Sequence, residues 1–228
     1  MIPISEQGPL QDNPLLRTLA PAQLHTLLKN SEQLVLGKNT KIFEQGDIAR
    51  YLFFVLDGSV KIYRLTQDGQ DKVFHVISPG ENFGEDMLFS IEACHAYSAQ
   101  TVTDCTLLQV PHSLYRSLAS ENTGLTLALL SQLSGLEQNS LETIEILSFK
   151  KSSHRIIRYL LGQALRSCKS CAAFQFELPA TKRLVASQLS IQPETLSRVL
   201  SQLEREELVK LDGRKICIPD PDALAAYD

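Results

Sequence analysis

The sequence lacks the features that would send the chain into or across a membrane. No stretch approaches the ~20 consecutive apolar residues that a transmembrane helix needs. The N-terminus, MIPISEQGPLQDNPLL, has no basic region followed by an apolar run, so we expect no signal peptide. Hydrophobic residues make up 43% of the 228 positions, which is enough for a folded core. We therefore expect a cytoplasmic globular protein with no membrane partner.

The sequence also lacks the cysteine pattern of a disulfide framework and the common motifs of enzymes. An odd number of cysteines without a leader argues against such a framework. The cysteines are Cys94, Cys105, Cys168, Cys171 and Cys217. Cys168 and Cys171 have the spacing of a metal or redox pair, but no obvious second ligand pair accompanies them. We therefore assign no metal, and an incidental solvent-exposed pair is the alternative. No G-x-S-x-G, H-E-x-x-H or P-loop motif occurs, and we expect no enzymatic activity.

Charge is unevenly distributed along the chain. Residues 1–148 carry nine basic and seventeen acidic side chains, a net charge of −8, whereas residues 149–228 carry thirteen and nine, a net charge of +4. An acidic body followed by a basic segment indicates two domains, of which the second meets a polyanion. Chance clustering of surface charge is the alternative.

Residues 40–111 have the pattern of short antiparallel strands. Glycines at 46, 58, 69 and 80 separate apolar, β-branched runs, and two of these glycines belong to Asp-Gly turns. The runs are YLFFVL (51–56), SVKIYRL (59–65), KVFHVI (72–77) and CTLLQV (105–110). Together with a short helix over Pro21–Lys29, they predict an antiparallel β-roll domain over residues 1–122. YLFFVL is apolar on both faces, so we expect it at the centre of the roll.

A long helix follows, over residues 123–148. Leucines and isoleucines at 129, 133, 136, 144 and 147 recur at steps typical of a dimer seam, and Leu130 and Leu141 widen the apolar surface. The pattern predicts a dimerisation helix in which Leu129, Leu133, Leu136 and Ile144 contact a second copy of the chain. A helix buried wholly within its own domain is the alternative.

The basic segment, residues 149–228, reads as a DNA-binding domain after the polar linker SFKKSSH (148–154). A helix is expected from His154 to Leu165, then a strand over 174–178, then two helices within 181–206. Pro193 suits the first position of the second helix. That helix buries Leu196, Val199, Leu200 and Leu203, which leaves Glu194, Thr195, Ser197 and Arg198 to read base edges.

The last predicted element is a β-hairpin over LVKLDGRKICI (208–218), around Asp212-Gly213. A helical pair followed by a hairpin on a basic segment makes a winged helix-turn-helix. The residues expected to contact phosphates are Thr181, Lys182, Arg183, Gln192, Arg214 and Lys215. A helical hairpin with a solvated polar face is the alternative. The expected fold class is α+β: an antiparallel roll, a dimerisation helix and a winged domain.

These features together resemble the Crp/Fnr family of bacterial transcription regulators. The resemblance covers residues from about 15 to 225 and includes ENFGEDMLF (81–89) and PETLSR (193–198). It implies that the roll is a jelly roll like that of cyclic-nucleotide-binding domains. It also implies a homodimer that activates transcription with RNA polymerase and binds double-stranded DNA at TTGAT inverted repeats, read by Glu194, Ser197 and Arg198. The roll and VASQLSIQPETLSRVL also resemble the dissimilatory nitrate respiration regulators, which implies nitric oxide sensing through haem and control of denitrification.

The Crp/Fnr resemblance alone does not identify the effector, because members of the family respond to different ligands. Cyclic-AMP-binding members bracket a phosphate with a Gly-Glu pair and an Arg-Ser pair. Gly84-Glu85 matches the first pair, but His95-Ala96 stands in place of the second, so a cyclic phosphate would lose its main charge partner. We take Gly84, Glu85, His95 and Ala96 as the candidate effector pocket. Because the first cysteine is Cys94, no iron–sulfur cluster of the Fnr type is expected.

Haem needs an axial ligand in an apolar crevice. Among the five histidines, His75, His95 and His112 are the candidate ligands, since His25 and His154 lie on helices outside the pocket region. No CxxCH occurs, which excludes covalent c-type attachment. The alternatives are a cyclic nucleotide, another small ligand or a redox signal in the same fold, or a roll domain that serves an enzyme or a regulatory subunit rather than DNA binding.

Overall fold

A computed structural model describes residues 8–90, 94–167, 174–178 and 181–227. Cys168 and Cys171 lie outside these residues. The chain forms two compact units that divide between Glu137 and Gln138, inside the long helix α3 (Thr123–Ser148). The predicted boundaries at 122 and 148 correspond to the two ends of this helix instead.

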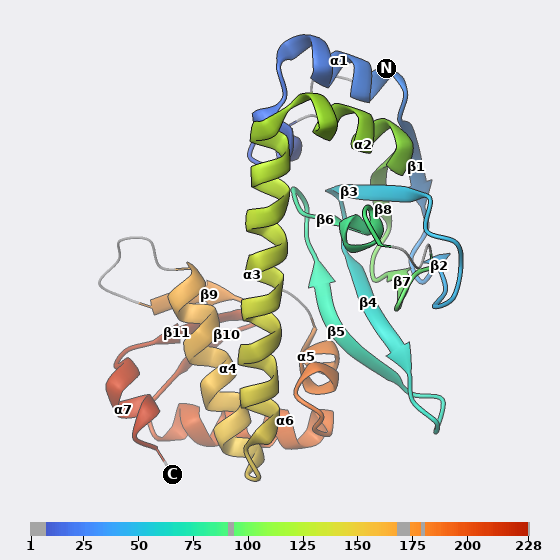
Figure 1. Cartoon of the computed structure of the whole chain (residues 1–228). Helices are drawn as coiled ribbons and strands as arrows, with labels where there is room; N and C mark the ends of the chain where they lie inside the picture. The colour runs from blue at the N-terminus through green and yellow to red at the C-terminus, as the bar shows by residue number, and fades with distance from the viewer. Residues whose placement is uncertain (1–7, 91–93, 168–173, 179–180, 228) are drawn as a thin grey trace. The chain divides into compact units, whose positions relative to one another are not determined.

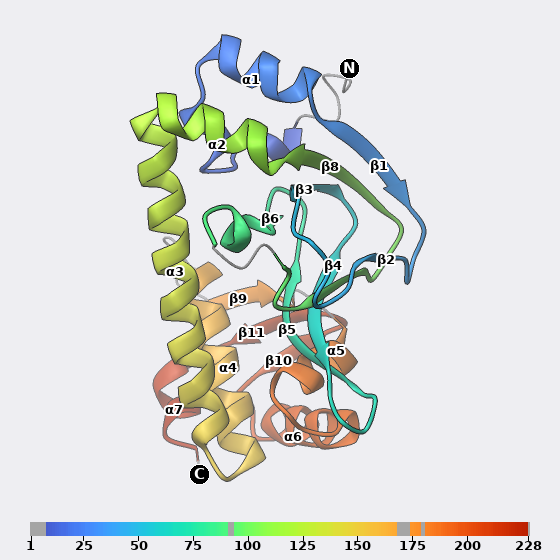
Figure 2. The same cartoon turned by 45° about the vertical axis from the view of Figure 1, so that its right-hand side comes forward.

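The first unit contains two four-stranded antiparallel sheets (Figures 1 and 2). The first has the order β1 (Glu32–Leu36), β8 (Cys105–Pro111), β3 (Tyr51–Asp57), β6 (Asn82–Phe83). The second has the order β2 (Lys41–Phe43), β7 (Ser98–Thr101), β4 (Val60–Leu65), β5 (Asp71–Ile77). The antiparallel roll is thus confirmed, and all four predicted strands are present. Sequence reasoning missed the other four strands and helix α2 (His112–Glu121).

Strand β3 explains why YLFFVL has no polar face. Phe53 and Val55 point into a core shared with β4 and β7, whereas Leu52, Phe54 and Leu56 belong to a second core. This second core is covered by α1 (Pro21–Lys29), α2 and the start of α3. Because alternate side chains on a strand point to opposite faces, a strand buried on both faces must be apolar throughout. Its predicted central position is confirmed.

Gly58 and Gly84 are two glycines of the roll that combine a left-handed backbone with a close neighbour. Gly58 has φ +82°, and a Cβ there would lie 2.2 Å from the carbonyl oxygen of Asp104. Gly84 has φ +88° and approaches the carbonyl of Tyr51. The left-handed backbone favours glycine at both positions, and at Gly58 the close carbonyl oxygen also excludes a side chain on steric grounds. Gly84 immediately precedes the short 3-10 helix η4 (Glu85–Met87), and so places Glu85 inside the roll.

Helix α3 divides its leucines between the roll and solvent. Leu125 and Leu129 are buried in the second core, and Leu133 packs against it. Leu129 is 2% exposed, so its side chain serves the chain's own core rather than the predicted contact with a second copy. The large apolar side chains that the helix leaves exposed are Leu127, Leu130, Leu136, Leu141 and Ile144.

The second unit is the predicted winged helix-turn-helix. Its elements after α3 are α4 (Ser152–Ser167), β9 (Phe174–Glu177), α5 (Lys182–Gln188), α6 (Pro193–Arg205), β10 (Lys210–Asp212), β11 (Lys215–Ile218) and α7 (Pro221–Ala225). The three strands form an antiparallel sheet in the order β10-β11-β9. Asp212-Gly213 closes the β10–β11 hairpin, with Gly213 at φ +61°, as its turn chemistry predicts. None of the described helices could span a membrane.

Candidate DNA interface and effector pocket

Helix α6 separates a buried face from an exposed polar face. Leu196, Val199, Leu200 and Leu203 are buried as predicted. On the other side Glu194, Ser197 and Arg198 are exposed, and Thr195 is half-buried. Pro193 occupies the first helical turn after an extended Gln192, whose side chain makes no capping bond. The helical spacing of the four buried residues therefore leaves three polar side chains exposed near the N-terminal end of α6. In a recognition helix, residues at this end contact base edges.

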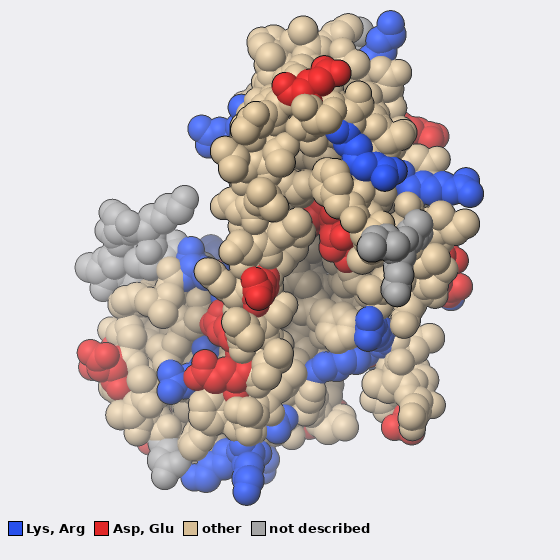
Figure 3. All heavy atoms as spheres, in the orientation of Figure 1, with Lys and Arg blue, Asp and Glu red and all other residues tan. Residues whose placement is uncertain are grey.

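Three of the predicted phosphate-binding residues are exposed on neighbouring elements of the second unit. Lys182 and Arg183 are exposed in the first turn of α5, and Lys215 is exposed at the start of β11. Figure 3 shows basic side chains gathered at the lower edge of this unit. A surface with this charge attracts a nucleic-acid backbone and holds it in a salt-dependent way.

Arg214 differs from the other predicted phosphate contacts. Its Nη2 and Nε donate to the carbonyl oxygen of Leu178 at 2.6 and 3.1 Å, and its Nε lies 3.4 Å from Glu177 Oε1. The guanidinium therefore joins the wing to the end of β9. The side chain is still 52% exposed, and its remaining N–H donors can reach a phosphate, so Arg214 can hold the wing and contact DNA at the same time.

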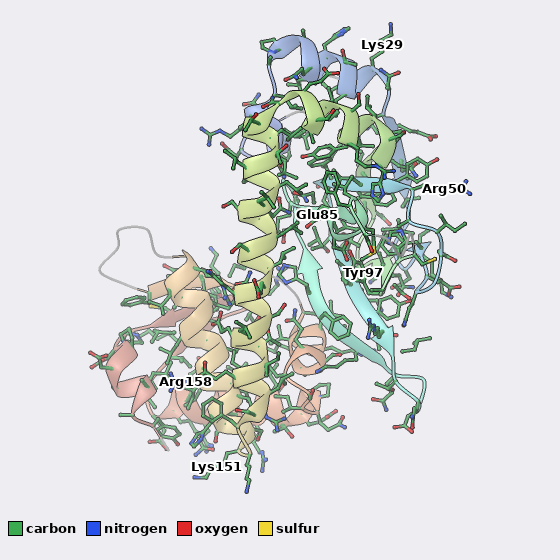
Figure 4. All side chains as sticks on the ribbon, viewed as in Figure 1. Lys29, Arg50, Glu85, Tyr97, Lys151 and Arg158 are labelled. Atoms are coloured by element: carbon green, nitrogen blue, oxygen red, sulfur yellow. The ribbon has the colours of Figure 1, made fainter. Side chains whose placement is uncertain are left out.

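Glu85, one of the four candidate effector residues, is a buried carboxyl group. It is 4% exposed, and its Oε1 accepts a hydrogen bond of 2.9 Å from Gln132 Nε2 on α3. Its Oε2 has no hydrogen-bond partner among the described residues, and the same holds for Asn82 Nδ2 and Tyr115 Oη. Burial raises the pKa of Glu85 to about 7. Figure 4 shows Glu85 and Tyr97 inside the first unit.

His95 lies in the same unit as part of an aromatic cluster. Its ring stacks on Phe43 with centroids 3.5 Å apart and an interplanar angle of 6°. The side chain is buried, and its Nδ1 has no hydrogen-bond partner among the described residues. Burial lowers the pKa of His95 to about 4, so the imidazole is neutral at pH 7. Phe53, Phe83 and Tyr97 surround Phe43 and complete the cluster.

The other two candidate haem ligands are placed differently. His112 is buried, and its Nε2 donates to the carbonyl oxygen of Gly84 at 3.1 Å, which supports the turn before Glu85. Burial lowers the pKa of His112. His75 is exposed on β5. Of the three, His95 combines burial with an unpartnered ring nitrogen. No group of three or more His, Cys, Asp or Glu within the described part of the chain could hold a metal ion.

Sequence reasoning missed two residues of the pocket region. Gln132, which lies 47 residues after Glu85 in the sequence, donates a hydrogen bond to the Glu85 carboxylate. Arg64, on β4, donates from its Nε to the carbonyl oxygen of Ala96 at a distance of 2.7 Å. Arg64 therefore places a cation beside Ala96, where cyclic-AMP-binding relatives have their own Arg-Ser pair. Neither contact leaves a local pattern in the sequence, because each joins segments that meet through the fold.

Comparison with known proteins accounts for both units. Residues 33–122 match a cyclic nucleotide-binding domain, and residues 154–227 match a Crp-like helix-turn-helix domain. The crystal structure of DNR from Pseudomonas aeruginosa is 37% identical over the full length of both chains, with a TM-score of 0.53. The chain belongs to the Crp/Fnr family of transcription regulators.

Other members of the family agree with this assignment. The nitrogen fixation regulation protein FixK of Azorhizobium caulinodans is 28% identical over 91% of this chain and 83% of its own. The fumarate and nitrate reduction regulatory protein of Salmonella typhimurium is 23% identical over 90% of this chain and 80% of its own. A CooA variant from Carboxydothermus hydrogenoformans is 20% identical over 94% of this chain and 95% of its own, with a TM-score of 0.78, which shows the shared fold. The FixK and fumarate and nitrate reduction proteins are regulatory proteins by name, and the match to the Crp-like helix-turn-helix domain assigns DNA binding to the winged unit of this chain.

Proposed function

We propose that the chain acts as a homodimeric transcription activator that binds TTGAT-type inverted repeats, contacts RNA polymerase and responds to nitric oxide through haem to control denitrification genes. The observation that carries the DNA part is the exposure of Glu194, Ser197 and Arg198 at the N-terminal end of α6. Arginine takes guanine by two parallel hydrogen bonds, and glutamate accepts a hydrogen bond from cytosine. The identity with DNR supports the effector part.

Two sets of changes test the DNA part. Arg198 is replaced by alanine in the protein, and each base pair of the half-site is replaced in turn by the other three base pairs. Removal of a bidentate base contact costs about 1–3 kcal/mol, and the variant no longer distinguishes the base pairs at that position. Ser201→Ala, on the exposed side of the same helix but further from its N-terminus, is the matched control. Unchanged preference at every half-site position in Arg198→Ala would contradict the assignment.

His95 fits the requirements of a haem ligand better than His75 or His112 does. Its imidazole is neutral, its buried Nδ1 lacks a partner within the described part of the chain, and aromatic side chains provide the apolar surroundings that haem requires. Haem iron held by an imidazole supplies a binding site for diatomic gases. In this proposal the chain's own contribution is the ligand nitrogen of His95 and the exclusion of water by Phe43, Phe53 and Phe83.

Absorption spectra after haem addition test this assignment. The wild-type protein should take up haem stoichiometrically and show a Soret band that shifts when the reduced form meets nitric oxide. His95→Ala should lose this uptake, whereas His75→Ala, which alters an exposed histidine on the same roll, should retain it. An unchanged Soret band in His95→Ala would exclude His95 as the ligand, and no uptake by the wild type would exclude the haem mechanism.

A cyclic nucleotide is the second candidate effector, because the first unit matches a cyclic nucleotide-binding domain. Two observations weigh against it. Glu85, which corresponds to the glutamate of the Gly-Glu pair in that pocket, is buried and bonded to Gln132. His95 and Ala96 replace the arginine and serine that would hold the cyclic phosphate, although Arg64 offers a cation nearby. Calorimetric titration with cyclic AMP separates the candidates: heat of saturable binding would favour the nucleotide.

A further inference from the structure

Arg155, near the start of α4, contacts two segments of the winged unit that lie far apart in the sequence. Its Nε donates to the carbonyl oxygen of Phe149 at 2.7 Å. Its Nη1 lies 3.4 Å from the carbonyl oxygens of both Leu189 and Ser190. One guanidinium therefore bridges the segment after α3 and the turn between α5 and α6.

The first of these segments is fixed to α4 by more than one contact. The Phe149 ring meets His154 edge-on at 6.1 Å between centroids, and the Arg158 guanidinium lies 5.7 Å from its centroid. Edge-to-face pairs and cation–π contacts are each directional, so the ring has a defined place. Together with the Arg155 bond to the backbone, these contacts hold Phe149 against the first two turns of α4.

The second segment is the turn of the helix-turn-helix. Leu189 is the C-terminal cap of α5, and Ser190 has φ +53°, a left-handed conformation that a non-glycine residue adopts at some cost. Carbonyl oxygens at a helix C-terminus carry a partial negative charge and attract a cation. The planar guanidinium can serve several such oxygens at once, which a lysine ammonium does less well. The turn continues into Gln192 and Pro193, where α6 begins.

We propose that Arg155 is a positioning residue for DNA recognition: it ties the segment after α3 to the turn that orients the recognition helix α6. The inference rests on the proposed function, and gives it a specific coupling element. The residues proposed to read bases, Glu194, Ser197 and Arg198, lie in the first two turns of α6, which begins three residues after Ser190. A displacement of Phe149 would move Arg155, which also holds Leu189 and Ser190. The displacement would therefore be passed directly to the turn before the N-terminal end of α6.

The test compares Arg155→Met with Arg205→Met. Both changes remove one positive charge from the same unit, but the Arg205 side chain bonds to the carbonyl of Ser201 on its own helix. Binding to a TTGAT inverted repeat and to a scrambled repeat is measured over a range of salt concentrations. Arg155→Met should weaken specific binding about tenfold or more, as a mismatched base pair does, and leave binding to the scrambled repeat unchanged.

The salt dependence separates positioning from direct contact with DNA. A residue that bonds to carbonyls and not to phosphates releases no counterion, so the slope of log K against log salt should equal that of the wild type. A shallower slope in Arg155→Met would overturn the proposal in favour of a phosphate contact. Equal specific binding by wild type, Arg155→Met and Arg205→Met would overturn it as well.

Hydrogen exchange gives a measurement that does not depend on the DNA sequence. In the turn the amide of Ser190 donates to Ser187 and that of Ile191 to Ala186, at 3.2 and 3.0 Å. Arg155→Met should speed the exchange of these two amides, whereas exchange in β10 and β11 should not change. Unchanged protection at the turn would overturn the inference. Failure of the wild type to prefer the TTGAT repeat would instead count against the proposed function.

Discussion

At the scale of single residues, Glu85 is the side chain whose environment differs most from that of an ordinary carboxyl group. It is buried, its Oε1 is bonded to Gln132, and its Oε2 has no partner among the described residues. Burial raises its pKa to about 7 from a usual value of 4.5. The folded protein therefore binds a proton here that the unfolded chain has already released at neutral pH.

The raised pKa predicts that Glu85→Gln stabilises the protein at neutral pH. In the wild type, the contribution of Glu85 to stability is complete below pH 4.5 and is lost as pH rises to about 7, by roughly 3 kcal/mol. Glutamine carries no charge and keeps an oxygen that can accept from Gln132. The difference in melting temperature between Glu85→Gln and wild type should therefore grow from pH 4.5 to pH 7.5.

His95 has the opposite effect in part of the same range. Its pKa is lowered to about 4 by burial, so the folded protein loses stability as pH falls from 6.5 towards 4. Because His95 is present in both proteins, the difference between the two melting curves isolates Glu85. Glu121→Gln, which changes an exposed glutamate on α2, is the control. A difference between Glu85→Gln and wild type that does not vary with pH would contradict the raised pKa.

A comparison of Gly58 with Gly69 separates the steric cost of adding a side chain from the cost of a left-handed backbone. Gly58 and Gly69 both have positive φ, +82° and +72°, but a Cβ at Gly69 would meet nothing within 4 Å, whereas at Gly58 it would lie 2.2 Å from the Asp104 carbonyl oxygen. Gly69→Ala should lose about 1 kcal/mol of unfolding free energy from the left-handed backbone. Gly58→Ala should lose more, because the backbone of the β7–β8 turn must also move. Urea unfolding measures both, and equal losses would contradict the close approach.

Residue-scale contacts mark the limit of what the sequence alone predicts. The exposure of Glu194, Ser197 and Arg198 follows from the 3.6-residue period and Pro193, so it is predictable. The engagement of Arg214 with Leu178 and of Gln132 with Glu85 is not, since each depends on which distant backbone or side chain the fold brings near. The same reason hides the three-way contact of Arg155.

At the scale of elements, strongly periodic segments were predictable and short ones were not. The four longer β-strands, α3 and both helices of the helix-turn-helix each have an apolar run or a periodic pattern long enough to identify the element. Strands β2 and β6 have three and two residues, which is too short for a period to show. In β1, Val35 is exposed, so that strand lacks a regular apolar face on the sheet edge. Helix α2 begins directly after Pro111, the last residue of β8, so no loop separates the two elements.

Helix α5 gives a prediction for the electrostatic part of DNA binding. Lys182 is exposed in its first turn, at the end of α5 opposite the turn that leads into α6. Lys182→Ala should weaken binding to specific and scrambled DNA alike, and lower the salt slope by about 0.9 for each phosphate that the side chain no longer neutralises. Lys210→Ala, which removes an exposed lysine from β10, is the comparison. Weaker binding confined to the specific sequence would show that Lys182 reads bases instead.

At the scale of the whole molecule, the proposed dimer depends on the apolar side chains that α3 leaves uncovered. Leu127, Leu130, Leu141 and Ile144 are each 57–64% exposed. Their spacing of 3, 11 and 3 residues puts them on one side of the helix, the arrangement of a coiled-coil seam. Leu129 packs into the core of the roll instead. The leucine pattern of α3 therefore combines residues that pack on the roll with residues proposed to form the dimer interface.

The dimer is tested by Ile144→Asp. A charge in the seam should shift the protein from dimer to monomer in sedimentation equilibrium, because an unpaired buried charge costs several kcal/mol at an interface. The change should not lower the melting temperature of the roll, since Ile144 belongs to neither of the roll's described cores. Leu65→Asp, at an exposed leucine of β4, is the control. A dimer that persists in Ile144→Asp would place the interface elsewhere.

Two exposed recognition helices in a symmetric dimer imply a fixed distance between half-sites, and this is the most direct test of the proposed function. Fluorescence anisotropy should show the wild-type protein binding a TTGAT inverted repeat at least about a thousandfold more tightly than a scrambled repeat at physiological salt. Insertion of about five base pairs, half a helical turn, between the half-sites should remove most of this preference. Equal binding to all three DNAs would contradict the account.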